Sequence, residues 1–142
     1  RGAGSDTASV ERTAELIQAA QTRTHTDPND PERLLAALGG PEFAVLAGVC
    51  LGAAEAGSPV VLDGLATSVA ALIATKFSPG LHGWLVASQA SREQVHHIVL
   101  AELGLEALME LRMRAGEGVG ACFGAQMILT GLQVRRTAAR TC

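Results

Sequence analysis

Pro59-Val60-Val61-Leu62-Asp63-Gly64 is the stretch of sequence that decides the fold, together with Trp84-Leu85-Val86-Ala87 further along the chain. Neither run alternates apolar and polar residues, which is typical of short parallel strands that helices cover on both faces. Residues 66–76 between the runs and residues 92–103 after them are predicted helices. Strand, helix, strand, helix in this order predicts a right-handed βαβ unit. We therefore expect an α/β fold, a parallel sheet of short buried strands flanked by helices in a Rossmann-like three-layer arrangement.

Four further helices are expected outside this unit. Their predicted ranges are 6–21, 31–38, 41–56 and 118–134, with an exposed loop over 22–29. Asp30-Pro31-Glu32 is a strong helix start, because it offers an N-cap, a proline at the first helical position and an acid in the first turn. The helix over 41–56 is apolar almost all round, so we expect it to be buried on most faces.

Polar side chains follow both predicted strands. Ligands of parallel sheets bind beyond the carboxyl ends of the strands, and Asp63 and residues 88–91 lie there. Asp63 has two interpretations: it orients a substrate, or it caps the helix that starts near Ala66. Ser91-Arg92-Glu93-Gln94 matches a capping box, and the same helix start is also a natural anion site.

A glycine-rich segment near the end of the chain holds a single carboxylate. In Arg114-Ala115-Gly116-Glu117-Gly118-Val119-Gly120, the glycines remove side chains where a ligand can approach the backbone. The helix that begins near Glu117 favours an ionised carboxylate at its N-terminus. Such a group suits the task of accepting a proton from a bound heterocycle. The alternative is that Glu117 only complements the helix dipole.

Composition narrows the class of protein. The chain has 142 residues, of which 48% are hydrophobic, enough for a real core, and a formal net charge of −3 argues against nucleic acid as a partner. The longest uncharged run, residues 118–134, contains glycine and glutamine, which argues against a membrane span. The three cysteines, Cys50, Cys122 and Cys142, form no CxxC motif or Cys/His cluster that would indicate a metal. Their odd number and the lack of a signal-peptide pattern favour a reducing, cytoplasmic setting. His96 and His97 are adjacent on a predicted helix and diverge by about 100°, so they do not chelate one ion; we expect an exposed or partly buried pair.

Five motifs in order resemble the nicotinate-nucleotide–dimethylbenzimidazole phosphoribosyltransferase family. They are Gly2-Ala3-Gly4, Asp27-Pro28-Asn29-Asp30-Pro31, Pro59-Val60-Val61-Leu62-Asp63-Gly64, Ala87-Ser88-Gln89-Ala90-Ser91-Arg92-Glu93 and Met113-Arg114-Ala115-Gly116-Glu117-Gly118-Val119-Gly120-Ala121. The resemblance covers nearly the whole chain. It implies a pentosyltransferase that transfers phosphoribose from nicotinate mononucleotide to 5,6-dimethylbenzimidazole, giving α-ribazole 5′-phosphate and nicotinate in cobalamin lower-ligand biosynthesis, with no cofactor.

The resemblance also assigns residue roles. Glu117 is the implied general base, which deprotonates one nitrogen of the benzimidazole while the other nitrogen attacks the ribose. The implied substrate-binding residues are Asp63, Gly64, Ser91, Ala115, Gly116 and Gly118. Where the family often has leucine against the aromatic ligand, this chain has Ala115, which loosens the pocket. Where the family usually has lysine in the first helix, it has Thr13.

Family members are longer than this chain. Residues 1–142 resemble a single C-terminal segment, and the family's upstream segment that handles the ribose phosphate is absent from it. We therefore expect the isolated chain to be inactive, and the whole enzyme to be a cytoplasmic homodimer that binds small-molecule substrates. The alternative is a truncated or degenerate homologue that is not catalytic and acts only in folding or association.

Overall fold

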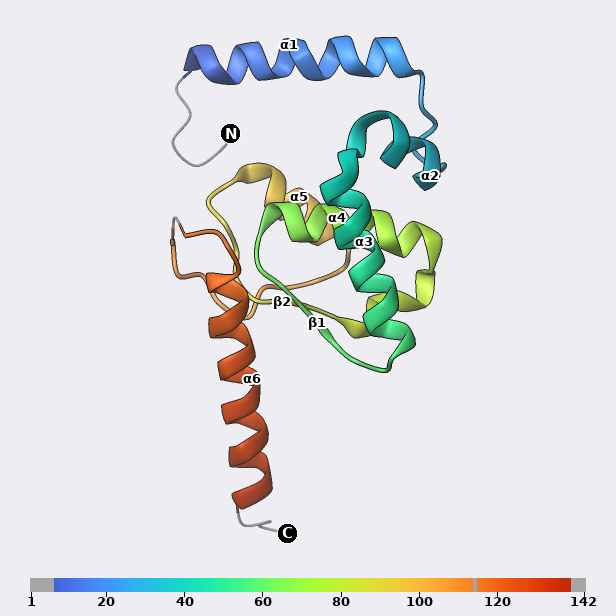
Figure 1. Ribbon diagram of the computed structural model, residues 1–142. Coiled ribbons are helices and arrows are strands. Elements are labelled where there is room, and N and C mark those ends of the chain that lie inside the picture. Colours follow the sequence, from blue (N-terminus) through green and yellow to red (C-terminus); the bar gives the residue numbers. More distant parts are fainter. Residues whose placement is uncertain (1–6, 114, 139–142) are drawn as a thin grey trace.

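The computed structural model describes residues 7–113 and 115–138. Its elements, in chain order, are the helices α1 (Thr7–Thr24) and α2 (Pro31–Leu34), the π-helical turn η1 (Leu35–Gly39), α3 (Gly40–Glu55), β1 (Val60–Leu62), α4 (Leu65–Phe77), the 3-10 turn η2 (Pro79–Trp84), β2 (Leu85–Ala87), α5 (Gln94–Glu102) and α6 (Val119–Thr137). The described chain is mostly helical, with one small parallel sheet. In Figure 1, α3, α4 and α5 gather around this sheet, α1 stands apart from them, and α6 extends away as a single helix.

The βαβ unit is confirmed. β1 and β2 pair in parallel, with Val61 opposite Val86, and α4 connects them. The sheet also continues on the other side of β2, where Leu108 donates a backbone hydrogen bond to Ala87 and Ala90 donates one to Met109. This third extended segment was not predicted, because its residues lack a β-rich run.

The two faces of β1 meet different helices. Leu62 is buried in the main core, which also contains Leu85 and residues of α3, α4 and α5. Val61 points to the other face, as the alternation of a strand requires. There it faces Gly124 of α6: a Cβ atom built on Gly124 would lie 3.4 Å from Val61 Cγ1 and only 2.6 Å from Ser88 Cβ. The absence of a side chain at Gly124 therefore lets α6 lie directly against the ends of the strands.

Most predicted helix limits differ from the structure by a few residues. α1 continues to Thr24, into the predicted loop, and α5 begins at Gln94 rather than Arg92. The helix start at Asp30 is confirmed, since its carboxylate accepts a hydrogen bond from the backbone N–H of Arg33 (3.0 Å). The predicted cap Asp6 lies outside the described residues.

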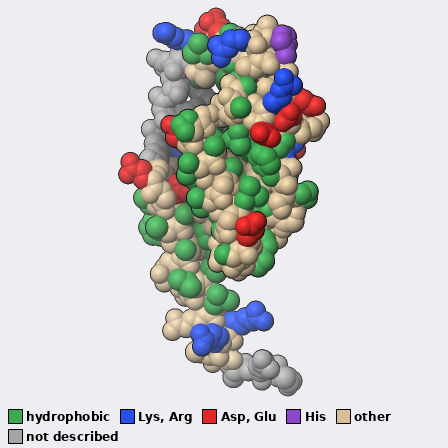
Figure 2. Space-filling view, turned by 45° about the vertical axis from the view of Figure 1, so that its right-hand side comes forward, with side chains coloured by type: hydrophobic (Ala, Val, Ile, Leu, Met, Phe, Trp, Pro, Cys, Tyr) green, Lys and Arg blue, Asp and Glu red, His purple; other side chains and the backbone are tan. Residues whose placement is uncertain are grey.

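The prediction for α3 was wrong. Of its side chains, only Ala47 and Cys50 are buried, while Val45 and Val49 are 65% and 57% exposed. One face of α3 packs on α4, and within the described chain nothing covers the opposite face. Figure 2 shows many hydrophobic side chains on the visible surface of the body.

Among the described residues, one helix is long and apolar enough to cross a membrane. The continuous helical stretch Pro31–Glu55 has a mean hydropathy of 1.9 in its most apolar window. A single helix of this kind is weak support for a membrane span, because core helices have the same composition. The absence of a membrane span stays a prediction.

Candidate active site

One pocket lies beyond the carboxyl ends of β1 and β2. Its volume is about 350 Å³. It is lined by residues from four segments: Asp63, Gly64, Leu65, Ala66 and Thr67; Gln89, Ser91, Arg92 and Glu93; Met113; and Ala115, Gly116 and Glu117. Six of the seven predicted site residues thus meet around one pocket, which we call the site pocket. The seventh, Gly118, supports it from the start of α6.

Glu117 and Gly118 form a sharp turn into α6. Both have left-handed backbone conformations, with φ of 61° and 85°, and the helix begins at Val119. Glycine adopts this conformation freely, whereas a glutamate there is unusual. Strained backbone of this kind is concentrated at functional sites. The turn holds the Glu117 side chain, which is solvent-exposed, at the mouth of the pocket.

Asp63 connects the sheet to this turn. Its carboxylate accepts hydrogen bonds from the backbone N–H groups of Ala121 (3.0 Å) and Gly118 (3.4 Å), more than fifty residues away in the sequence. An acceptor with negative charge at a helix N-terminus satisfies free N–H groups and complements the dipole. Asp63 therefore caps α6.

Of the two interpretations of Asp63, a cap for the helix near Ala66 is not found, because its carboxylate binds the start of α6. Thr67, in the first turn of α4, instead binds the residues that precede the helix: its hydroxyl accepts hydrogen bonds from the backbone N–H groups of Asp63 (3.0 Å) and Gly64 (3.1 Å). Thr67 also donates to the Gly64 carbonyl (3.0 Å). Thr67 thus fixes the backbone of Asp63 and Gly64, while the Asp63 carboxylate reaches α6.

The glycines around Glu117 differ in why the structure needs, or does not need, glycine at each position. A Cβ atom on Gly120 would lie 2.8 Å from Cγ and Nε2 of Gln89 and 2.9 Å from Oδ1 of Asp63. Gly120 is therefore required for packing against protein, not for ligand approach as predicted. Gly118 provides the left-handed turn, and a Cβ on Gly116 would meet nothing within 4 Å.

Ser91 is held by a histidine rather than by a capping box. The backbone N–H of Ser91 donates to Nδ1 of His96 (3.0 Å), and the Ser91 hydroxyl accepts from the backbone N–H of Glu93 (3.2 Å). α5 has Glu93 as its N-cap, with no side-chain cap. The predicted capping box was wrong, because the helix starts later and Ser91 forms a local turn before it.

His96 is buried, with 1% of its surface exposed, so the expectation of an exposed or partly buried pair holds only for His97. Since Nδ1 accepts a hydrogen bond, the proton is on Nε2, which donates to the hydroxyl of Ser68 in α4 (3.0 Å). Burial lowers the pKa of His96, and nearby His97 lowers it further, whereas Glu93 and Asp63 oppose the shift. The neutral imidazole thus joins α4, α5 and the Ser91 loop.

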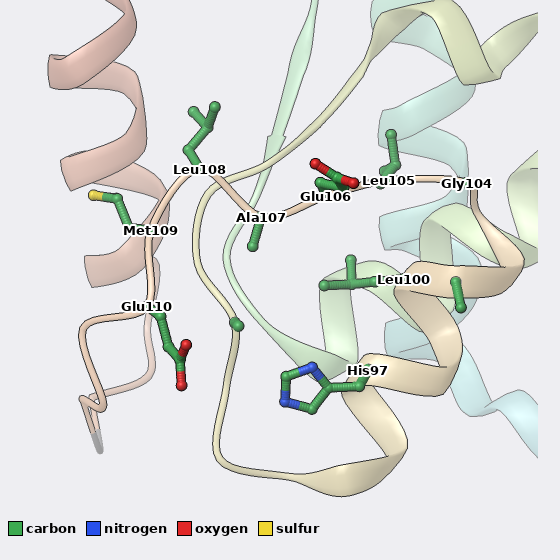
Figure 3. A pocket seen from close by; sticks show the side chains of 11 residues that line it. His97, Leu100, Gly104, Leu105, Glu106, Ala107, Leu108, Met109 and Glu110 are labelled. Atoms are coloured by element: carbon green, nitrogen blue, oxygen red, sulfur yellow. The ribbon is translucent and has the colours of Figure 1, made fainter.

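A second, larger hollow of about 650 Å³ lies between α5 and the segment that follows it, residues 104–110. Figure 3 shows His97 of α5 on one side of it and the segment from Gly104 to Glu110 around it. None of the predicted site residues lines this hollow. The glutamate segment and the strand ends lie at the site pocket instead, so we place the chemistry there.

Among residues 7–113 and 115–138, no group of three or more metal-ligating side chains comes together. The absence of a metal and of a cofactor stays a prediction. Gly2, Ala3 and Gly4, which carry the first of the five motifs, lie outside the described residues, as does Arg114.

The chain is similar in sequence to proteins of one known family. A family model described as phosphoribosyltransferase matches residues 1–141. The nicotinate-nucleotide–dimethylbenzimidazole phosphoribosyltransferase of Desulforudis audaxviator is 39% identical over 135 residues, which are 95% of this chain and 38% of the relative. The enzyme of the same name from Salinispora tropica is 42% identical over 134 residues, 94% of this chain and 37% of the relative.

The fold agrees with this match. The crystal structure of CobT from Thermus thermophilus superposes with a TM-score of 0.89 at 34% identity, over 98% of this chain and 41% of that one. The chain therefore spans about two fifths of the length of the proteins it matches. On the family match over nearly all of its residues, and on the agreement in fold, this chain belongs to the phosphoribosyltransferase family.

Proposed function

We propose that the complete gene product carrying this sequence transfers phosphoribose from nicotinate mononucleotide to 5,6-dimethylbenzimidazole. The products are α-ribazole 5′-phosphate and nicotinate, in cobalamin lower-ligand biosynthesis. One observation carries the proposal: Glu117, on a strained turn, lines the same pocket as the ends of both strands. The names of the relatives give the substrate class.

In this reaction Glu117 is the general base. Its carboxylate accepts the proton of the benzimidazole N–H while the other ring nitrogen attacks C1′ of the ribose from the face opposite nicotinate. The new C–N bond forms as the bond to nicotinate breaks, and nicotinate leaves with the electron pair, so the configuration at C1′ inverts from β to α. An azole whose N–H faces a carboxylate is a better nucleophile, and alignment of the two substrates supplies much of the rate.

The other site residues hold this arrangement. Asp63 fixes the turn that carries Glu117 through its hydrogen bonds to α6. We assign substrate contacts to Gly64, Gly116 and Ser91 at the pocket wall and to the backbone at Gly118. Ala115, which is exposed beside Glu117, leaves space for the aromatic base and for other bases of similar shape.

We propose further that residues 1–142 form the C-terminal segment of a Rossmann-like three-layer domain. Helices on both faces of β1 support this arrangement, with Leu62 facing the core and Val61 facing α6. We also propose a cytoplasmic homodimer. The apolar surface that remains exposed on α3 and α6, for example Val45, Phe123 and Leu129, supports the homodimer.

The test is benzimidazole-dependent release of nicotinate from nicotinate mononucleotide by the complete gene product, followed chromatographically. Product formation supports the proposal. If the folded product binds neither substrate and releases no nicotinate, the alternative of a non-catalytic homologue is correct. The isolated 142-residue chain should show no turnover, because positioning requires both substrates to be held; turnover by this chain alone would contradict that part.

A further inference from the structure

The side chain of Gln89 has an unusual environment. Gln89 follows β2, is 3% exposed, and lines the site pocket. Its carbonyl oxygen Oε1 is buried and accepts no hydrogen bond. Buried polar atoms in proteins almost always have a partner, so an isolated one calls for an explanation.

The packing around Gln89 shows why it stays at this position. Its Cγ and Nε2 atoms lie directly against Gly120 of α6, at 2.8 Å from the place of a Cβ atom there. Its backbone is paired in parallel with Met109. The side chain is therefore confined between the sheet and the start of α6, and only the terminal amide is able to turn. That torsion is broad and turns at low cost.

We infer that Gln89 accepts a hydrogen bond from a ribose hydroxyl of the bound nucleotide. The inference rests on the proposed function. When the amide turns Oε1 toward the site pocket, a bound ligand supplies the donor, and the substrates differ in the donors they have. Dimethylbenzimidazole has a single N–H, which Glu117 takes in the proposed reaction. The phosphate and the nicotinate carboxylate are ionised and mainly accept hydrogen bonds, so the 2′ and 3′ hydroxyls of the ribose are the donors that remain.

This assignment gives Gln89 a role in specificity. A site with a buried acceptor rejects an analogue that lacks the hydroxyl, since the acceptor is then left unpaired. Gln89 therefore selects nucleotides that carry this hydroxyl over analogues that lack it. Gln89 lies at the pocket wall in the segment after β2, whereas Glu117 lies in the turn before α6, so the two groups hold different parts of the reacting pair.

The test compares Gln89→Met with wild type in the complete gene product. Methionine keeps the unbranched shape and removes the amide. Gln126→Met, at an exposed position of α6, is the matched control. In assays of nicotinate release, Gln89→Met should lower kcat/KM for nicotinate mononucleotide about tenfold, the equivalent of one buried hydrogen bond. The KM for dimethylbenzimidazole should be unchanged.

Two analogues, 2′-deoxy and 3′-deoxy nicotinate mononucleotide, identify the hydroxyl. With wild-type enzyme one of them should lose about the same tenfold, and Gln89→Met should use that analogue and the ribose substrate equally well. An equal loss for both analogues in both enzymes would overturn the inference. So would unchanged kinetics of Gln89→Met.

Stability separates binding from a structural role. Without substrate, Gln89→Met should unfold at the same temperature as wild type or higher, because it removes an unpaired buried oxygen. A lower melting temperature together with losses toward both substrates would show a structural role and contradict the inference.

If Gln89→Met does not fold, Gln89→Asn, which withdraws the amide by one methylene, should give the same kinetic result. Wild-type activity tests the proposed function separately: the inference fails alone if wild type is active and the variants match it.

Discussion

Removing the Asp63 carboxylate should loosen the start of α6 and, with it, Glu117. Asp63→Ala deletes the acceptor of two backbone N–H groups, those of Gly118 and Ala121. Loss of a helix cap costs about 0.5–2 kcal/mol, and loss of a negative charge at a helix N-terminus costs about 0.3–1 kcal/mol. The free energy of unfolding of Asp63→Ala should therefore fall by about 1–3 kcal/mol.

Asp63→Asn separates the two contributions. Asparagine keeps an oxygen that accepts the Ala121 N–H but has no charge, so its loss should be only about 0.3–1 kcal/mol. Urea unfolding of the complete gene product, followed by circular dichroism, measures both values. Glu110→Ala is the control, since Glu110 is an exposed carboxylate outside the site pocket.

The same variants test the role of Asp63 in catalysis. If Asp63 acts through α6, Asp63→Ala should lower kcat together with stability, because Glu117 is no longer held in place. A variant as stable as wild type with a raised KM for the nucleotide would refute the capping account, and Asp63 would then be a direct substrate contact.

Two further predictions concern packing and pH. Burial lowers the pKa of His96 below its ordinary value of 6.5, so the unfolded state binds the proton more strongly than the folded state. The contribution of His96 to the free energy of unfolding should therefore be constant above about pH 7 and fall as the pH drops through 6.5 and below. In urea unfolding, His96→Asn should be less stable at neutral pH and show a flatter pH profile, and an unchanged slope would contradict this. Gly124→Ala would place a Cβ atom 2.6 Å from that of Ser88 and should lower the free energy of unfolding by about 1–3 kcal/mol. Gly131→Ala on the same helix, where a Cβ atom would meet nothing within 4 Å, should raise the free energy of unfolding by about 0.5–1 kcal/mol. Equal effects of the two changes would be inconsistent with close packing of α6 on the strands.

The parts of the fold that local patterns determine were predictable from the sequence. Val60–Leu62 and Leu85–Ala87 are apolar runs with β-branched residues, and their order around a helix predicts the parallel pair that the structure shows. The start of α2 followed from Asp30-Pro31, whose cap depends on neighbouring residues alone. The extended segment at Leu108 and Met109 was not predictable in this way, because it is defined by pairing with β2 and not by its own composition.

The sequence predicted where most of the proposed site residues would gather, but it did not show which hydrogen bonds connect them. Polar residues after the strands and the glycine-flanked Glu117 pointed to one edge of the sheet, and the structure brings them to one pocket. The partners of Asp63 lie more than fifty residues along the chain, so no local pattern showed that it caps α6. His96 was missed because its burial depends on how α5 packs on α4, where Ser68 supplies the partner.

The central claim, that Glu117 is the general base of phosphoribosyl transfer, is tested most directly by Glu117→Gln in the complete gene product. Glutamine keeps the size and a hydrogen-bond acceptor but takes no proton. Turnover should fall by about 10²–10⁴-fold, while dimethylbenzimidazole still binds and the melting temperature changes little. A near-normal rate, with a stability loss of about 0.3–1 kcal/mol, would contradict the account and leave Glu117 as a carboxylate that only complements the helix dipole.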